Sequence, residues 1–218
     1  MQTTAWDDIL SQYDHIEAHC RNTTSGLLVH GYDESLKAVW ANPVTGAAPL
    51  VWDRAVGWYF LSLWEALQVF PQSHAGYQKL LGYFTTLAAA LKKTQDEASG
   101  GWWLIMSEPY PGAAGNYIES SASAMFVLGL LRGVRSGYLA SAEYLAPART
   151  GYEALVDRFV VENADGTLDW EGTVEVGSLS SNGTYEYYIS VPLATNDYKG
   201  AGPFMLASYE WESWASSA

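Results

Sequence analysis

The chain has 218 residues, of which 49% are hydrophobic, and it is expected to form one globular domain over residues 1–218. Its 24 acidic residues outnumber its 11 Lys and Arg residues and give a net charge of −13, which disfavours nucleic acid and anionic membrane surfaces as partners. No apolar run approaches the roughly 18 residues that a membrane span needs. A single cysteine excludes an intrachain disulfide.

The start of the chain, Met1–Trp6, lacks the basic and apolar regions of a secretory signal peptide. Two triplets of the glycosylation type occur, at Asn22 and Asn182, but such triplets arise often by chance. No signal peptide is therefore expected in this chain, and both a secreted and a cytoplasmic localisation stay open.

Hydrophobic periodicity predicts six helices of two alternating kinds. The first, third and fifth are amphipathic, whereas the second, fourth and sixth are apolar on nearly every side and are expected to be buried. The expected ranges, in chain order, are 6–20, 54–70, 75–94, 120–135, 141–163 and 199–211.

The connections alternate as well, because short links follow the buried helices and long ones follow the amphipathic helices. The long connections cover 21–53, 95–119 and 164–198, and loops of this length are usually functional. Each opens with a glycine before a short apolar or aromatic run, which is typical of a short strand. The pattern repeats about every 65–75 residues.

This repeat predicts an all-α fold of the (α/α)6-toroid type, here an incomplete ring of about six helices in three hairpins. The amphipathic helices would form the outer layer and the apolar ones the inner layer, with the long connections gathered at the N-termini of the inner helices. Those N-termini carry unpaired N–H groups that suit hydroxyl-rich or anionic ligands. A solenoid of three hairpins satisfies the same pattern.

The first long connection and the helix after it concentrate polar and aromatic residues. Taken singly, they have structural explanations: a hydrogen-bonded His30, and Asp53 as a helix N-cap. Arg54 is a cation in the first turn of a helix, where the helix dipole disfavours it, so it should pair with a negative group, either Asp33, Asp53 or a ligand. Together they favour a ligand site. The many Trp and Tyr residues have two explanations that composition does not separate: they pack the core, or they line a sugar site. The residues are His30, Asp33, Trp40, Trp52, Asp53, Arg54 and Trp58.

Three motifs in this region carry a resemblance to a known family. They are Ser25-Gly-Leu-Leu-Val-His-Gly-Tyr-Asp33, Trp40-Ala-Asn-Pro-Val-Thr-Gly46 and Trp52-Asp-Arg-Ala-Val-Gly-Trp58. With later stretches at 116–126 and 185–204, they resemble the unsaturated glucuronyl/galacturonyl hydrolases of glycoside hydrolase family 105, which include the unsaturated rhamnogalacturonyl hydrolases. The resemblance covers essentially the whole chain.

The resemblance implies an (α/α)6 barrel and an activity on unsaturated uronic-acid oligosaccharides from pectin degradation. In this family an aspartate protonates the C4=C5 double bond and activates a water, and hydration at C5 leads to release of the sugar. By the same resemblance, His30, Trp52, Arg54 and Trp58 are the expected substrate-binding residues, with Arg54 facing the uronate carboxylate. No metal cluster or phosphate-binding loop is visible, so no cofactor is expected.

Two departures from the family pattern bear on activity. Many relatives have glycine where this chain has Asp53, which would place an extra anion beside Arg54. The family's general acid/base aspartate lies upstream of the first helix, and this chain has no counterpart for that segment. We therefore expect the C-terminal part of the fold with no assignable catalytic residue, and a non-catalytic or degenerate carbohydrate-binding protein is the alternative.

Half a ring would leave two open flanks on its apolar inner helices. Large exposed apolar patches are rare on soluble monomers, so a homodimer that covers these flanks through a two-fold contact is expected. The rival outcome is a monomer in which the hairpins twist shut.

Overall fold

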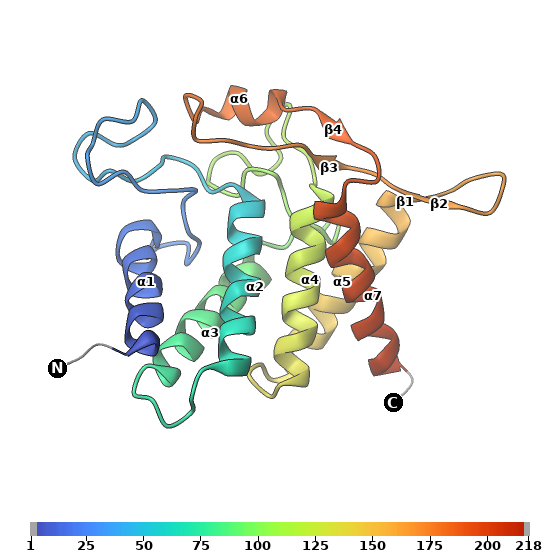
Figure 1. The fold of residues 1–218 in the computed structure, drawn as a ribbon. Helices are drawn as coiled ribbons and strands as arrows, with labels where there is room; N and C mark the ends of the chain where they lie inside the picture. Colours follow the sequence, from blue (N-terminus) through green and yellow to red (C-terminus); the bar gives the residue numbers. More distant parts are fainter. Residues whose placement is uncertain (1–3, 216–218) are drawn as a thin grey trace.

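The computed structural model describes residues 4–215 and shows an arc of helices in two layers that stays open on one side (Figure 1). The inner helices are α2, α4 and α7, with α4 packed between the other two. The outer helices are α1, α3 and α5, of which α3 packs on α2 and α5 on α4. The expected incomplete ring of three hairpins is thereby confirmed. The bounds are α1 Ala5–Cys20, α2 Asp53–Val69, α3 Tyr77–Thr94, α4 Ser120–Arg135, α5 Ser141–Phe159 and α7 Tyr198–Ala215.

The third long connection contains the short strand that the sequence pattern predicts after Gly166, β2 (Leu168–Trp170), and further regular structure that the pattern did not predict. A short helix, α6 (Tyr185–Ser190), lies within it, and the fifth helix ends at Phe159 rather than near residue 163. It ends early because the β-branched Val160 and Val161 leave the helix for a strand. Two small antiparallel pairs result: β1 (Val160–Glu162) with β2 (Leu168–Trp170), and β3 (Thr173–Val174) with β4 (Leu193–Ala194).

The core lies between the two layers and is centred on α4, most of whose residues are buried. Small residues let the inner helices approach closely. A Cβ at Gly129 would lie 2.4 Å from the ring of Phe60, and one at Gly57 would lie 2.7 Å from the sulfur of Met125. Phe60 itself stacks on Phe84 of α3, with ring centroids 4.7 Å apart, and so joins the inner layer to the outer one.

Helix α1 is the exception, because none of its residues is buried. Its N-terminus has a capping box formed by Thr4 and Asp7, so local interactions favour the helix. The apolar face predicted from the sequence is only partly covered, and Ile9 and Ile16 remain 36% and 38% exposed. Tertiary anchoring comes from hydrogen bonds, such as Tyr59 Oη donating to Glu17 at 2.7 Å.

The three long connections gather at one face, where the inner helices begin (Figure 1). They are tied to one another across long sequence distances, for example by Trp40 Nε1, which donates to the carbonyl of Leu179 at 2.7 Å. Trp40 therefore serves to hold the first connection against the third. Within residues 4–215, no helix is both long and apolar enough to cross a membrane.

Candidate functional site

A cavity of about 730 Å³ opens between the C-terminal half of α1, the first long connection and the first turns of α2. Its walls mix apolar side chains with polar ones, including three histidines. Glu34 is the one carboxylate among the described residues that line it. The described chain holds no group of three or more His, Cys, Asp or Glu side chains placed to bind a metal ion. The polar lining residues are His15, His19, Cys20, His30, Tyr32, Glu34 and Tyr59.

His30 lines this cavity and is held on two sides. Its Nδ1 forms a hydrogen bond with the hydroxyl of Tyr188, and its ring packs on Trp52 with centroids 4.7 Å apart. Burial lowers the pKa of His30 to about 4, because a charged imidazolium is poorly solvated there. At neutral pH the ring is therefore uncharged, with one nitrogen that donates a hydrogen bond and one that accepts.

Trp52 lies beneath His30 and is only 6% exposed. The guanidinium carbon of Arg54 lies 5.0 Å from the centroid of its ring, close enough for a cation–π contact. Gly177 of the third connection also approaches the indole, since a Cβ there would lie 2.9 Å from it. Trp52 thus packs against the ring of His30 and exposes little of its own surface to a ligand.

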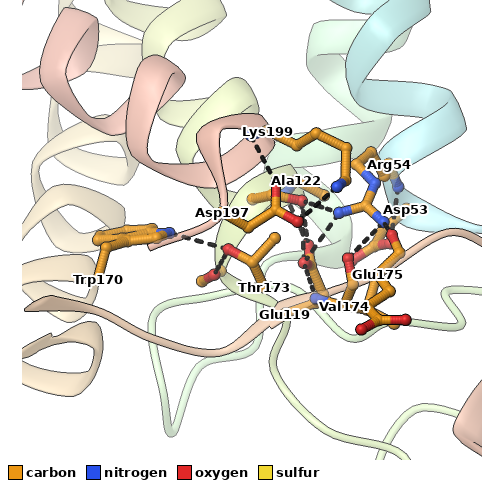
Figure 2. A network of polar contacts seen from close by, with 12 residues as sticks. Asp53, Arg54, Glu119, Ala122, Trp170, Thr173, Val174, Glu175, Asp197 and Lys199 are labelled. Atoms are coloured by element: carbon orange, nitrogen blue, oxygen red, sulfur yellow. Dashed lines mark hydrogen bonds and ion pairs between the residues drawn. The ribbon is translucent and has the colours of Figure 1, made fainter. Parts of the chain in front are cut away.

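Arg54 points inward, where its guanidinium binds groups of the protein itself, and it is 1% exposed (Figure 2). Its Nη1 donates to Ser121 Oγ at 2.9 Å and lies 3.7 Å from a carboxylate oxygen of Glu119. Its Nη2 donates to the carbonyls of Val174, at 2.6 Å, and Glu175. The negative group that pairs with Arg54 is therefore Glu119, the N-cap of α4.

Asp53 is the first residue of α2 and is fully enclosed. It does not cap the helix: the N-cap is Trp52, and Asp53 Oδ1 accepts from the backbone N–H of Arg54 at 2.6 Å. Burial, and then the nearby charge of Glu119, raise the pKa of Asp53 well above its usual range. The neutral carboxyl is favoured, so the extra anion expected beside Arg54 is suppressed by its surroundings.

Asp33 is committed to the structure of its own loop. One carboxylate oxygen accepts from Ser35 and the other from the backbone N–H groups of Lys37 and Ala38. These hydrogen bonds, led by that from Ala38, lower the pKa of Asp33 to about 2. An ionised, fully engaged carboxylate is a poor proton donor.

The four expected substrate-binding residues are thus arranged unequally. His30, Trp52 and Arg54 form a contiguous stack in which only His30 lines the cavity. Trp58, one turn further along α2, is 50% exposed and lies outside the cavity lining. No ring contact joins it to the other three within the described part of the chain. The substrate-binding role of all four stays a prediction.

Two residues that complete this region were missed in the sequence. Tyr188 and Glu119 lie 158 and 65 positions from the residues they contact, His30 and Arg54, so neither contact is visible in local spacing. The signal available was indirect, because both residues fall in the later stretches, 116–126 and 185–204, that resemble the family.

Known proteins resemble this chain over most of its length. The sequence model described as Glycosyl Hydrolase Family 88 matches residues 2–215. The "24.9 kDa protein in picA locus" of Rhizobium radiobacter is 38% identical over 194 residues, covering 85% of this chain and 82% of that protein. The unsaturated rhamnogalacturonyl hydrolase YesR of Bacillus subtilis is 29% identical over 119 residues, which are 55% of this chain and 31% of YesR.

A solved structure resembles both the sequence and the fold. It is the glycoside hydrolase from family 105 of C. acetobutylicum ATCC 824, with a TM-score of 0.90 and 38% identity. The match covers 95% of this chain and 58% of the clostridial one, so the chain spans a little over half the length of that protein. The resemblance to family 105 expected from the motifs is confirmed.

Proposed function

The chain belongs to glycosyl hydrolase family 88, and from that membership we propose that it supplies the sugar-recognition part of a hydrolase acting on unsaturated uronyl oligosaccharides released from pectin. The observation that carries the proposal is the cavity of about 730 Å³, which is lined by a neutral, hydrogen-bonded histidine. Its volume lies within the range of ordinary ligand pockets, about 300–1,000 Å³.

The proposed reaction adds water across the C4=C5 double bond of the terminal uronyl residue. It needs a proton delivered to C4 and a water directed at C5, whose own proton returns to the group that donated the first. Two carboxyl groups of this region are unsuited to that role, because Asp33 is ionised and locked in its loop, and Asp53 is enclosed. Glu34 is the one acidic residue among the described residues that line the cavity, so it is the carboxyl group of this chain that we propose as proton donor.

We expect the 218-residue chain to bind an unsaturated uronyl disaccharide and to turn it over slowly or not at all. Binding is measured by titration calorimetry, and turnover by loss of the ultraviolet absorbance of the double bond at high protein concentration. His30→Ala should weaken binding about 10-fold or more, since a buried hydrogen-bonding group that loses its partner typically costs about 1–3 kcal/mol.

The matched control is His74→Ala. His74 bonds to Asp7 and does not line the cavity, so this variant should bind like the unchanged chain. Absence of saccharide binding in the unchanged chain would overturn the proposed function. Binding without turnover supports the sugar-binding alternative, whereas turnover that Glu34→Gln abolishes assigns the acid to this chain.

We also propose that two copies associate through their open flanks. Helix α7, at one end of the arc, exposes Tyr198, Met205 and Tyr209 by 81%, 70% and 65%. At the other end, Trp58 is half exposed and α1 has no buried residue. A two-fold contact between copies would cover such faces, and a stable one should bury more than about 2,000 Å². The net charge of −13 opposes association, so it should strengthen with salt.

Sedimentation velocity at micromolar concentration tests this association. We expect a species of twice the chain mass of 23.9 kDa, which Met205→Glu converts to monomer because a charge would be buried in the contact. Val44→Glu, at a loop position that is 83% exposed, should leave the dimer intact. A single species near 23.9 kDa at all salt concentrations contradicts the proposal.

A further inference from the structure

The hydroxyl of Tyr188, in the third long connection, contacts the cavity residue His30. Tyr188 belongs to α6, is 1% exposed, and its hydroxyl bonds to Nδ1 of His30. No other hydrogen bond of this hydroxyl occurs within residues 4–215. The ring also packs near Trp52, with centroids 6.0 Å apart, so backing from two aromatic residues holds His30 in place.

The direction of this hydrogen bond follows from counting donors. A neutral imidazole carries one proton, on either Nδ1 or Nε2. If Nδ1 carried it, the ring would donate to the tyrosine oxygen, and the enclosed hydroxyl hydrogen would have no acceptor. An unsatisfied buried donor costs about 1–3 kcal/mol. The hydroxyl therefore donates, Nδ1 accepts, and the proton resides on Nε2.

The Nε2 edge of His30 is the part that remains free to meet a ligand. Nearby polar side-chain atoms that are both enclosed and without a partner are Trp52 Nε1, Asp53 Oδ2 and Tyr117 Oη. His30 Nε2 does not belong to this group, because it is not enclosed. It has no protein partner in the described part of the chain, and the residue lines the cavity.

We propose that Tyr188 is a positioning residue that fixes the proton of His30 on Nε2, so that the ring presents an N–H donor to the cavity. Such a donor favours an acceptor oxygen of the ligand, such as a carboxylate or ring oxygen, whereas the opposite tautomer would repel it. The binding of a ligand oxygen by this donor rests on the proposed function, whereas the position of the proton on His30 is a property of the ligand-free protein.

The tautomer is measured by two-dimensional 15N–1H correlation of the imidazole signals in the 218-residue chain, which has four histidines to assign. At pH 7 we expect His30 Nε2 at the shift of a protonated nitrogen and Nδ1 at that of an unprotonated one. Tyr188→Phe keeps the ring and removes the hydroxyl, so it should produce a mixture of tautomers. A proton on Nδ1 in the unchanged chain, or no change in the variant, would overturn the proposal.

The matched control is Tyr187→Phe. The neighbouring Tyr187 accepts from the backbone N–H of Ser178 at 2.8 Å and does not bond to His30, so this variant should leave the tautomer unchanged. The measurement on the unchanged chain keeps the proposal falsifiable even if Tyr188→Phe folds poorly, which circular dichroism reports.

Ligand binding forms a separate arm of the test. Tyr188→Phe should weaken disaccharide binding about 10-fold, and His30→Gln, whose amide N–H reaches further than that of Asn, should bind better than His30→Asn. Unchanged affinity in Tyr188→Phe would refute the positioning role. If no variant binds sugar but the tautomer is as expected, the proposed function fails and the assignment of the proton stands.

Discussion

Arg54→Ala is expected to lower the free energy of unfolding by about 3–5 kcal/mol, the usual cost of removing one partner of a buried ion pair. The guanidinium joins α2 to the N-terminus of α4 and to the backbone of β3 and the residue after it. Its loss leaves Glu119 enclosed without its cation and two carbonyls without their donor. Urea unfolding followed by circular dichroism measures the change.

The control is Arg149→Ala, which breaks an exposed ion pair with Glu153 one turn away and should cost no more than about 0.5 kcal/mol. Replacing both buried partners, as in Arg54→Met with Glu119→Gln, should recover much of the loss because no unpaired charge remains. If Arg54→Ala and Arg149→Ala cost the same, the buried network does not stabilise the junction of α2, α4 and β3.

Phe60→Ala is expected to destabilise the chain by about 3–5 kcal/mol through loss of buried apolar contact and a residual cavity. Phe60 is 0% exposed, stacks on Phe84 and fills the notch left by Gly129, so its removal opens space between three helices. These helices cannot close on the void without shifting their whole length, which keeps the cost near the upper part of the range.

Val69→Ala, at the last residue of the same helix, is the matched control because Val69 is 68% exposed. It should change stability by less than about 0.5 kcal/mol. Equal effects of Phe60→Ala and Val69→Ala in urea unfolding would contradict the described packing of α2 against α3 and α4.

The helical ring was readable from the sequence because its signal is periodic and local. Alternation between apolar and amphipathic stretches predicts the layer of each helix, and the lengths of the connections predict the face on which the loops gather. The strand β2 follows Gly166 as the pattern indicates, whereas β3 and β4 pair across the intervening α6, and α6 itself is too short for a helical period to show. Val160 and Val161 continue an amphipathic pattern and leave the helix only where β2 pairs with them.

The candidate site was only partly readable for the same reason. Sequence proximity correctly brought His30, Trp52 and Arg54 together, since one loop and one helix start supply them. It could not indicate that Arg54 would be occupied by Glu119 and by backbone carbonyls from residues 174 and 175. Arg54 is buried because the third connection packs over it, and the residues of that connection lie more than 100 positions away in the sequence.

The absence of buried residues in α1 has a consequence for how the chain opens. Local unfolding requires least free energy where the fewest apolar contacts are lost, so backbone amides of α1 should exchange with solvent water long before those of α4. The cavity beside His30 has one wall on this loosely held helix and another on the firmly packed α2. A ligand that bridges the two walls would therefore slow exchange in α1 most, because it would couple this helix to the more firmly packed α2.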